Sequence, residues 1–163
     1  MTPIAIRLGT LLFALLLCVR VAAAEEIRTD SFVLTVPPGW QQQIRTEGEL
    51  YNLTLSEPGD GLVLLLIIGP ARVPVERFVE RYRAKFERGG FTCSPITTRD
   101  GVCLMDFSSR ERKAHGSSYA ASNGGRTSIF MLLAHEKAGI ARLREVLRDN
   151  FTALDTGLFP GTF

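Results

Sequence analysis

Residues that supply reactive side chains are scarce in this sequence. Its 163 residues include two histidines, three cysteines and one tryptophan. With His115 and His135 as the only histidines, a histidine-rich metal site is excluded. The chain also lacks a Gly-x-Ser-x-Gly nucleophile motif, and His135-Glu136 is not followed by the second histidine of a zinc-protease motif. We therefore expect no catalytic residues, no metal site, no cofactor and no enzymatic activity.

Long hydrophobic runs are lacking as well, apart from one near the start of the chain. Arg7 is followed by an apolar run over residues 8–19, and then by the small residues Ala22-Ala23-Ala24. A positive start, a short apolar run and a small-residue cleavage site are typical of a secretory signal peptide. We predict that residues 1–24 are this signal peptide. Residues 25–163 would then be a single exported domain, located in the periplasm or outside the cell.

The exported part has no excess of either charge. Two of the 19 basic residues, Arg7 and Arg20, lie in the signal peptide, so 17 basic residues face 17 acidic ones. A neutral exported chain is not expected to bind nucleic acid. Leu17 precedes Cys18 where a lipidated cysteine requires a small residue, so we expect a soluble protein without a lipid anchor.

Hydrophobic periodicity predicts an α+β domain. Residues 62–68 and 127–133 are apolar on both faces, as in central strands of a sheet that is covered on both sides. Helices are predicted at 74–88 and 137–151. Further strands are predicted at 32–36, 40–45, 50–55, 91–94, 102–111 and 117–122, with turns at Asp100-Gly101, His115-Gly116 and Asn123-Gly124-Gly125. Short hairpins favour a mainly antiparallel sheet, flanked by helices on both faces in an α/β/α sandwich.

The first of these strands ends in "VPPGW", residues 36–40. This motif, the strands after it, a helix that follows an apolar strand, and a closing helix together resemble the PsbP-like fold. That fold is shared by a photosystem II extrinsic subunit and a Ran-binding import factor. The resemblance implies an antiparallel sheet between helices and an accessory or assembly role, but no one activity. No stretch matches a metal or partner site of the family, so no site residues are carried over.

Trp40, the only tryptophan, follows directly on the Pro-Pro-Gly turn. Two roles are open for it: a platform on which a ligand stacks, or a plug at the edge of the hydrophobic core. A lone tryptophan beside an apolar strand more often caps the core, with its indole N–H near the edge. We predict that Trp40 is a core plug.

The charges of the helix at 74–88 are sorted by sign. Glu76, Glu80 and Glu87 form an acidic stripe, and a basic stripe consists of Arg77, Arg81, Lys85 and Arg88. Like charges four residues apart destabilise a helix by about 0.2–0.5 kcal/mol per pair. Sorted charges therefore suit an acidic protein partner or an anionic lipid surface. The alternative is a solvated face whose charges pair with neighbouring loops.

Two cysteines, Cys93 and Cys103, remain after cleavage, and an even number in an exported chain favours a disulfide. A two-residue turn at Asp100-Gly101 would place Thr98 opposite Cys103 and leave Cys93 about 17 Å away along its strand. A wider loop would place the two cysteines opposite each other, and Pro95 favours it because proline interrupts regular pairing. We predict the disulfide; the alternative is two buried free thiols.

The leading functional hypothesis is a non-enzymatic exported accessory domain that binds a protein partner in the cell envelope. The sorted charges and the fold resemblance support it, and an apolar C-terminal tail with Phe159 and Phe163 offers another docking element. The second hypothesis is a small-molecule or lipid carrier, which requires a cavity beside Trp40 and the apolar strands.

Overall fold

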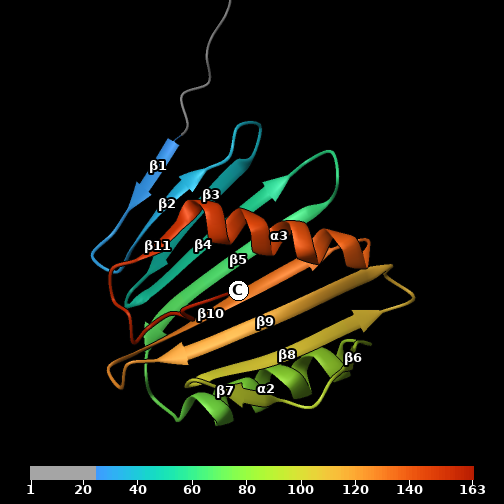
Figure 1. The fold of residues 1–163 in the computed structure, drawn as a ribbon. Coiled ribbons are helices and arrows are strands. Elements are labelled where there is room, and N and C mark those ends of the chain that lie inside the picture. Colours follow the sequence, from blue (N-terminus) through green and yellow to red (C-terminus); the bar gives the residue numbers. More distant parts are fainter. Residues whose placement is uncertain (1–24) are drawn as a thin grey trace, which may run out of the picture.

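Two antiparallel sheets and two helices make up residues 25–163, which the computed structural model describes (Figure 1). The predicted signal peptide lies outside these residues. The larger sheet has eight strands: β3 (Gln41–Glu47), β4 (Leu50–Glu57), β5 (Leu62–Pro70), β10 (Arg126–Ala134), β9 (Ala114–Ser122), β8 (Val102–Ser109) and β6 (Thr92–Cys93) in spatial order, with β7 (Thr97–Arg99) also paired to β8. The smaller sheet has the order β1 (Glu25–Arg28), β2 (Phe32–Val36) and β11 (Phe151–Ala153). The helices are α2 (Val75–Arg88) and α3 (Lys137–Asn150). The predicted α+β class and mainly antiparallel sheet are thus confirmed.

The pair β5–β10 lies at the centre of the larger sheet, as its two-sided apolar sequence predicted. In this pair Leu66 lies opposite Phe130, and Leu64 lies opposite Leu132. These four side chains are fully buried in the larger of two hydrophobic cores. This core also holds the apolar stripe of α3, and the smaller sheet closes it from the side of β2.

The alternate residues of the same strands belong to a second core. Ile129 and Met131 of β10 are buried there with Val79 of α2 and Phe107 of β8. Successive side chains of a strand point to opposite faces, so α2 and α3 pack against opposite sides of the sheet. The complete α/β/α sandwich stays a prediction, however, because α2 lies mainly over β6, β8 and β9.

The smaller sheet and the ordered tail were not predicted. β11 follows α3 directly and pairs with β2, so that Phe151 lies opposite Leu34. After it, Leu158 and Phe159 are buried, and Ser128 donates a hydrogen bond to the carbonyl oxygen of Leu158. Much of the apolar tail is therefore core material, and its Phe159 is not free to dock on a partner.

One predicted turn was wrong. His115-Gly116 lies inside β9, and the chain turns earlier, at residues 110–113, where Lys113 has a φ of 47°. Instead, Gly116 lets the ring of Phe107 on β8 pack closely against the backbone of β9, because a Cβ atom at position 116 would lie 2.2 Å from this ring. A glycine inside a strand often marks such a contact.

The predicted disulfide was also wrong, because the turn at Asp100-Gly101 is the narrow one. Asp100 and Gly101 have φ values of 51° and 77°, as a two-residue hairpin loop with left-handed residues requires. Thr98 consequently lies opposite Cys103, with its hydroxyl 3.6 Å from the sulfur, whereas Cys93 lies opposite Phe107. Four residues of strand, about 13 Å, separate the two positions, which exceeds the reach of a disulfide. Both cysteines are free thiols.

We predict that Phe130→Ala lowers the free energy of unfolding by about 3–5 kcal/mol, because it empties a fully buried position. The ring of Phe130 has its centroid 5.1 Å from that of Phe151 and 5.0 Å from that of Phe163. Urea unfolding followed by circular dichroism measures the loss. Leu154→Ala is the control: Leu154 is 49% exposed, and its truncation should change the stability by no more than about 0.5 kcal/mol.

We also predict that the protein isolated from its host has the mass of two free thiols. Burial raises the pKa of both thiols, and Glu87 raises that of Cys93 further. Alkylation of Cys93 should therefore be slow at neutral pH and accelerate as the pH rises, because the thiolate is the nucleophile. Cys103 is fully buried and should react only in denaturant. Mass spectrometry of the alkylated chain reads both sites, and the mass of an oxidised pair would contradict the expected register.

Candidate functional site

A large part of one sheet face has no helix over it. On the side of α2, the helix covers β6, β8 and β9, while β3, β4 and β5 lie beyond it (Figure 1). Val63, Leu65 and Ile67 of β5 are only partly buried, in contrast to the fully buried Leu64 and Leu66 that face α3. We call the α2-side face of β3, β4 and β5 the open face.

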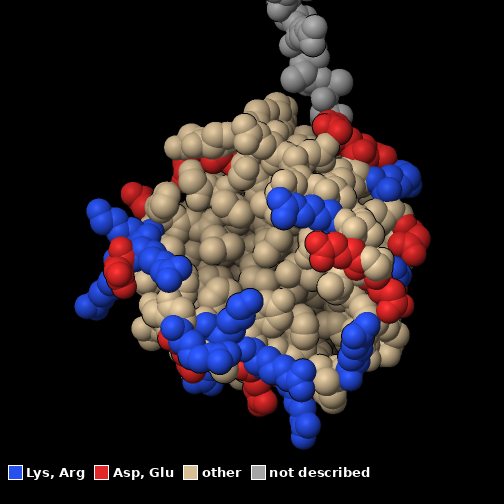
Figure 2. Space-filling model, turned by 180° about the vertical axis from the view of Figure 1, so that it is seen from behind, with Lys and Arg blue, Asp and Glu red and all other residues tan. Residues whose placement is uncertain are grey.

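The open face contains almost no charge. Next to the aliphatic row of β5, β4 contributes Asn52, Thr54 and Ser56, which lie opposite Ile67, Leu65 and Val63. Beyond them, β3 contributes Gln41 and Gln43, and towards its end the charged residues Arg45 and Glu47. Figure 2 views this side and shows a broad, hollowed area without Lys, Arg, Asp or Glu at its centre. Charged side chains of both signs surround it, and basic ones predominate along its lower edge, where α2 lies.

The predicted basic stripe borders this area. Arg77, Arg81, Lys85 and Arg88 are all exposed on α2. Among the described residues, the first three form no ion pair, whereas Arg83 pairs with Glu87 at 3.0 Å. Arg88 donates from Nε to the carbonyl oxygen of Ala84. The helix thus neutralises part of its acidic stripe internally and leaves the cations of its basic stripe free.

A groove of about 510 Å³ lies where α2 begins, against the hairpin that joins β3 and β4. Leu50, Val73 and Phe78 give it apolar walls. Its charged lining residues are Glu47, Glu49, Arg72 and Arg81. Leu50 is 43% exposed, although its side chain covers Gly69 so closely that a Cβ atom there would lie 2.6 Å from it. At the rim, Arg72 forms a 3.8 Å ion pair with Glu49. Exposed apolar side chains in such a groove are suited to bind an apolar group.

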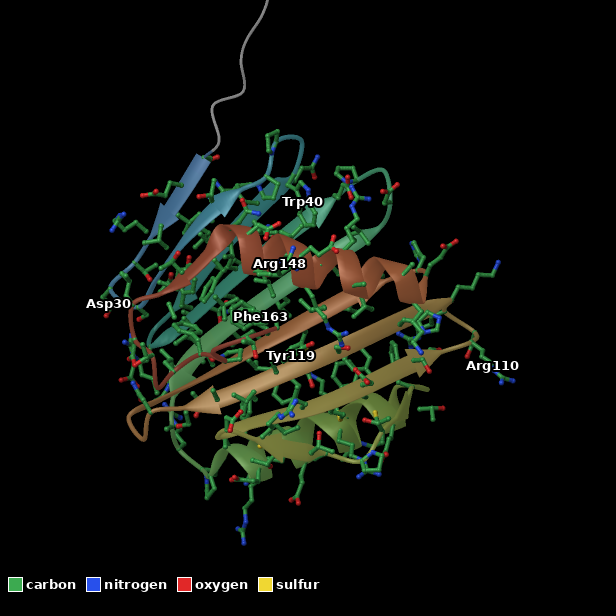
Figure 3. All side chains as sticks on the ribbon, in the orientation of Figure 1. Asp30, Trp40, Arg110, Tyr119, Arg148 and Phe163 are labelled. Atoms are coloured by element: carbon green, nitrogen blue, oxygen red, sulfur yellow. The ribbon has the colours of Figure 1, made fainter. Side chains whose placement is uncertain are left out.

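The other residues singled out from the sequence lie elsewhere. Trp40 is partly buried and packs against the edge of the larger core, on the opposite side of the molecule from the open face (Figure 3). His115 is partly buried in β9, and the Nδ1 atom of His135 lies 3.2 Å from the carbonyl oxygen of Lys113. Within residues 25–163, no three residues of the types His, Cys, Asp or Glu lie close enough together to hold a metal ion.

Sequence reasoning identified the basic stripe but missed the open face. The available signal was the alternation in β4, where Asn52, Thr54 and Ser56 are polar yet uncharged between Leu53 and Leu55. Such alternation predicts one buried and one polar face, and the lack of charge along the polar face was the signal for an uncharged surface. Leu50 and Phe78 carry no such signal, because each fits the apolar pattern of its own strand or helix.

The described part of the chain contains no helix with the length and hydrophobicity that crossing a membrane requires.

Comparison with known proteins finds a likeness in structure but none in sequence. No family model matches the chain, and neither does any curated protein. Among solved structures, the chain is similar to cyanobacterial PsbP (CyanoP) from Synechocystis sp. PCC 6803, with a TM-score of 0.53 and 13% sequence identity. The match covers 83% of this chain and 95% of that one. The protein therefore has a PsbP-like fold, as its sequence pattern predicted.

Proposed function

We propose that the protein is a non-enzymatic accessory domain that is exported to the cell envelope and binds a protein partner there. One observation carries the proposal: a broad hollowed sheet face without charge at its centre is bordered along α2 by exposed cations that form no ion pair within residues 25–163. Interface cores are typically depleted of charge and surrounded by a polar rim. The PsbP-like fold supports an accessory role, although a fold by itself does not determine a function.

The chemistry of the two surfaces defines the partner. The open face presents the half-buried aliphatic row of β5 and the neutral polar side chains of β4. A partner segment on it therefore presents apolar and uncharged polar side chains. Arg77, Arg81 and Lys85 attract acidic residues of the partner at one border, which speeds association and fixes its orientation. The groove beside Leu50 and Phe78 receives an apolar anchor.

The alternatives differ in what they require. An anionic lipid surface would use the basic stripe alone, and the uncharged hollow beside it would have no role. A small-molecule carrier, the second hypothesis from the sequence, would use a cavity beside Trp40, yet Trp40 lines none of five well-formed hollows in the described residues. The combination of an uncharged face and a charged border therefore favours the protein partner.

We predict that two unrelated changes to this surface abolish the same interaction. Arg77→Glu, Arg81→Glu and Lys85→Glu together reverse the border, and Thr54→Lys places a charge in the middle of the open face. The mature protein, tagged at its C-terminus, is used to capture binding proteins from the envelope fraction of its host. A true partner should be retained by the wild type and reduced at least tenfold by either change, as measured by quantitative mass spectrometry.

Matched controls separate this surface from net charge and from folding. The first control combines Arg110→Glu, Lys137→Glu and Arg148→Glu. It reverses three exposed cations in the β8–β9 turn and on α3; Arg110 and Arg148 are labelled in Figure 3. Thr152→Lys adds the same charge on an exposed position of β11. Both controls should retain the partner. The proposal would be refuted if every captured protein responded only to the total charge of the variant. It would also be refuted if the triple variant kept its partners and bound vesicles of phosphatidylglycerol as strongly as the wild type does.

A further inference from the structure

A second uncovered region lies on the other side of the sheet, beside α3. This helix packs over β5 and β10 and reaches β9, while the α3-side face of β8 lies beyond it. Three adjoining hollows of about 630, 340 and 510 Å³ follow this face. Arg144 of α3 lines all three, Asp106 and Ser117 line the first two, and Leu104 and Tyr119 line the last two. They form one groove with Arg144 at its centre.

Arg144 is held in place by neutral groups. Its Nε atom donates to the hydroxyl of Tyr119 at 2.6 Å, and its Nη2 atom donates to Oγ of Ser117 at 3.2 Å. The guanidinium carbon lies 5.9 Å from the centroid of the Tyr119 ring. Two other arginines of the helix differ in this respect, because Arg142 pairs with Glu57 at 2.9 Å and Arg148 pairs with Asp149 at 2.9 Å.

The charge of Arg144 is therefore uncompensated by direct contact. No carboxylate oxygen within residues 25–163 forms an ion pair with it, although its side chain is partly buried. Its Nη1 atom donates no hydrogen bond within those residues. Nη1 and Nη2 together present the fork that binds a carboxylate with two parallel hydrogen bonds. The fixed orientation of this fork is what a binding site needs, since little freedom is lost when a ligand arrives.

An opposite charge lies one hydroxyl group away. Ser117 stands between the two charges, accepting from Arg144 and donating to Oδ1 of Asp106. Asp106 is exposed, and its backbone is fixed by Ser94, whose N–H donates to the carbonyl of Asp106 and whose hydroxyl accepts from its N–H. The groove thus contains a fixed cation and a fixed anion that do not touch each other.

Aromatic and aliphatic side chains line the groove next to Arg144. The ring of Tyr119 meets that of Phe163 edge to face, with centroids 5.6 Å apart, and Leu104 lies beside them. Figure 3 shows Tyr119 and Phe163 side by side beneath α3. Such walls favour a ligand with an apolar or aromatic side chain.

We propose that this groove binds a free amino acid, or a small zwitterion of the same kind, with an apolar side chain. Its carboxylate binds the Nη1–Nη2 fork of Arg144, and its ammonium group binds the carboxylate of Asp106. Its side chain lies against Leu104 and Phe163, which are partly exposed in the groove, whereas Tyr119 is only 4% exposed. A peptide terminus supplies only one of the two charges at one residue, which is why a free zwitterion fits the arrangement better. The proposal concerns the α3 side and is independent of the protein partner on the open face.

Isothermal titration calorimetry of the mature protein tests this proposal with three matched probes. Phenylalanine has both charges, 3-phenylpropionate lacks the ammonium group, and phenylalanine amide lacks the carboxylate. Phenylalanine should bind at least tenfold more tightly than either analogue. Arg144→Gln should weaken phenylalanine at least tenfold, whereas Arg148→Gln, on an exposed face of the same helix, should leave its affinity unchanged.

A further variant keeps the test valid if loss of Arg144 disturbs folding. Asp106→Asn alters an exposed side chain and should reduce the affinity for phenylalanine to that for 3-phenylpropionate, while the latter still binds. Equal affinities of the three probes, no measurable binding of phenylalanine, or unchanged binding in Asp106→Asn would overturn the proposal. In each of these outcomes, capture of the protein partner through the open face should be unaffected.

Discussion

The requirement to cover the central strand pair on both faces determines the arrangement of this molecule. β5 and β10 carry apolar side chains on both of their faces, so burial of both faces is favoured. One helix cannot cover an eight-stranded sheet, and the chain supplies only two helices in the described residues. α3 and the smaller sheet close one face, and α2 closes part of the other. Everything that remains uncovered follows from how these elements are offset.

The offset leaves one open region on each face, and the two regions differ in chemistry. On the side of α2, β5 and β4 present apolar and neutral polar side chains next to the exposed cations of α2, which suits a broad contact with another protein. On the side of α3, β8 and β9 present Asp106, Ser117 and Tyr119 around a single arginine, which suits a small ligand. The difference arises because the first region lies beside a helix face of like charges, whereas the second lies beneath the half-buried Arg144.

The sequence was sufficient for the elements that depend on local pattern and insufficient for those that depend on contacts between distant residues. Both helices and the central strands were predicted to within a few residues, because their apolar patterns are regular; the ends of α2 are also marked by Pro74 and Gly89-Gly90. β1 and β11 were missed, because neither has a period of its own and each exists through pairing with β2. The turn before β9 was misplaced, because Gly116 was interpreted as a turn residue although it makes room for Phe107.

The same division applies to the surfaces. The basic stripe of α2 could be predicted, since helix geometry alone places residues three and four apart on one face. Which of its charges lack a partner could not, because that depends on residues brought near by folding. The disulfide was decided by a similar contact: two candidate registers existed, and the left-handed conformations of Asp100 and Gly101 selected the one that separates the cysteines.

The composition of β9 shows how the groove beside α3 comes to exist. Six consecutive residues of this strand, 116–121, are buried, yet five of them are glycine, alanine or serine, and only Tyr119 is large. On the side of α2 these small side chains accommodate the ring of Phe107 and the helix. On the side of α3, Ser117 fills little of the space above the sheet and offers a hydroxyl to both Arg144 and Asp106. A leucine there would have extended the hydrophobic core, as Leu132 does on the neighbouring strand. The hollow and its two separated charges therefore have one common cause, an interior strand next to the central pair that is built from small residues.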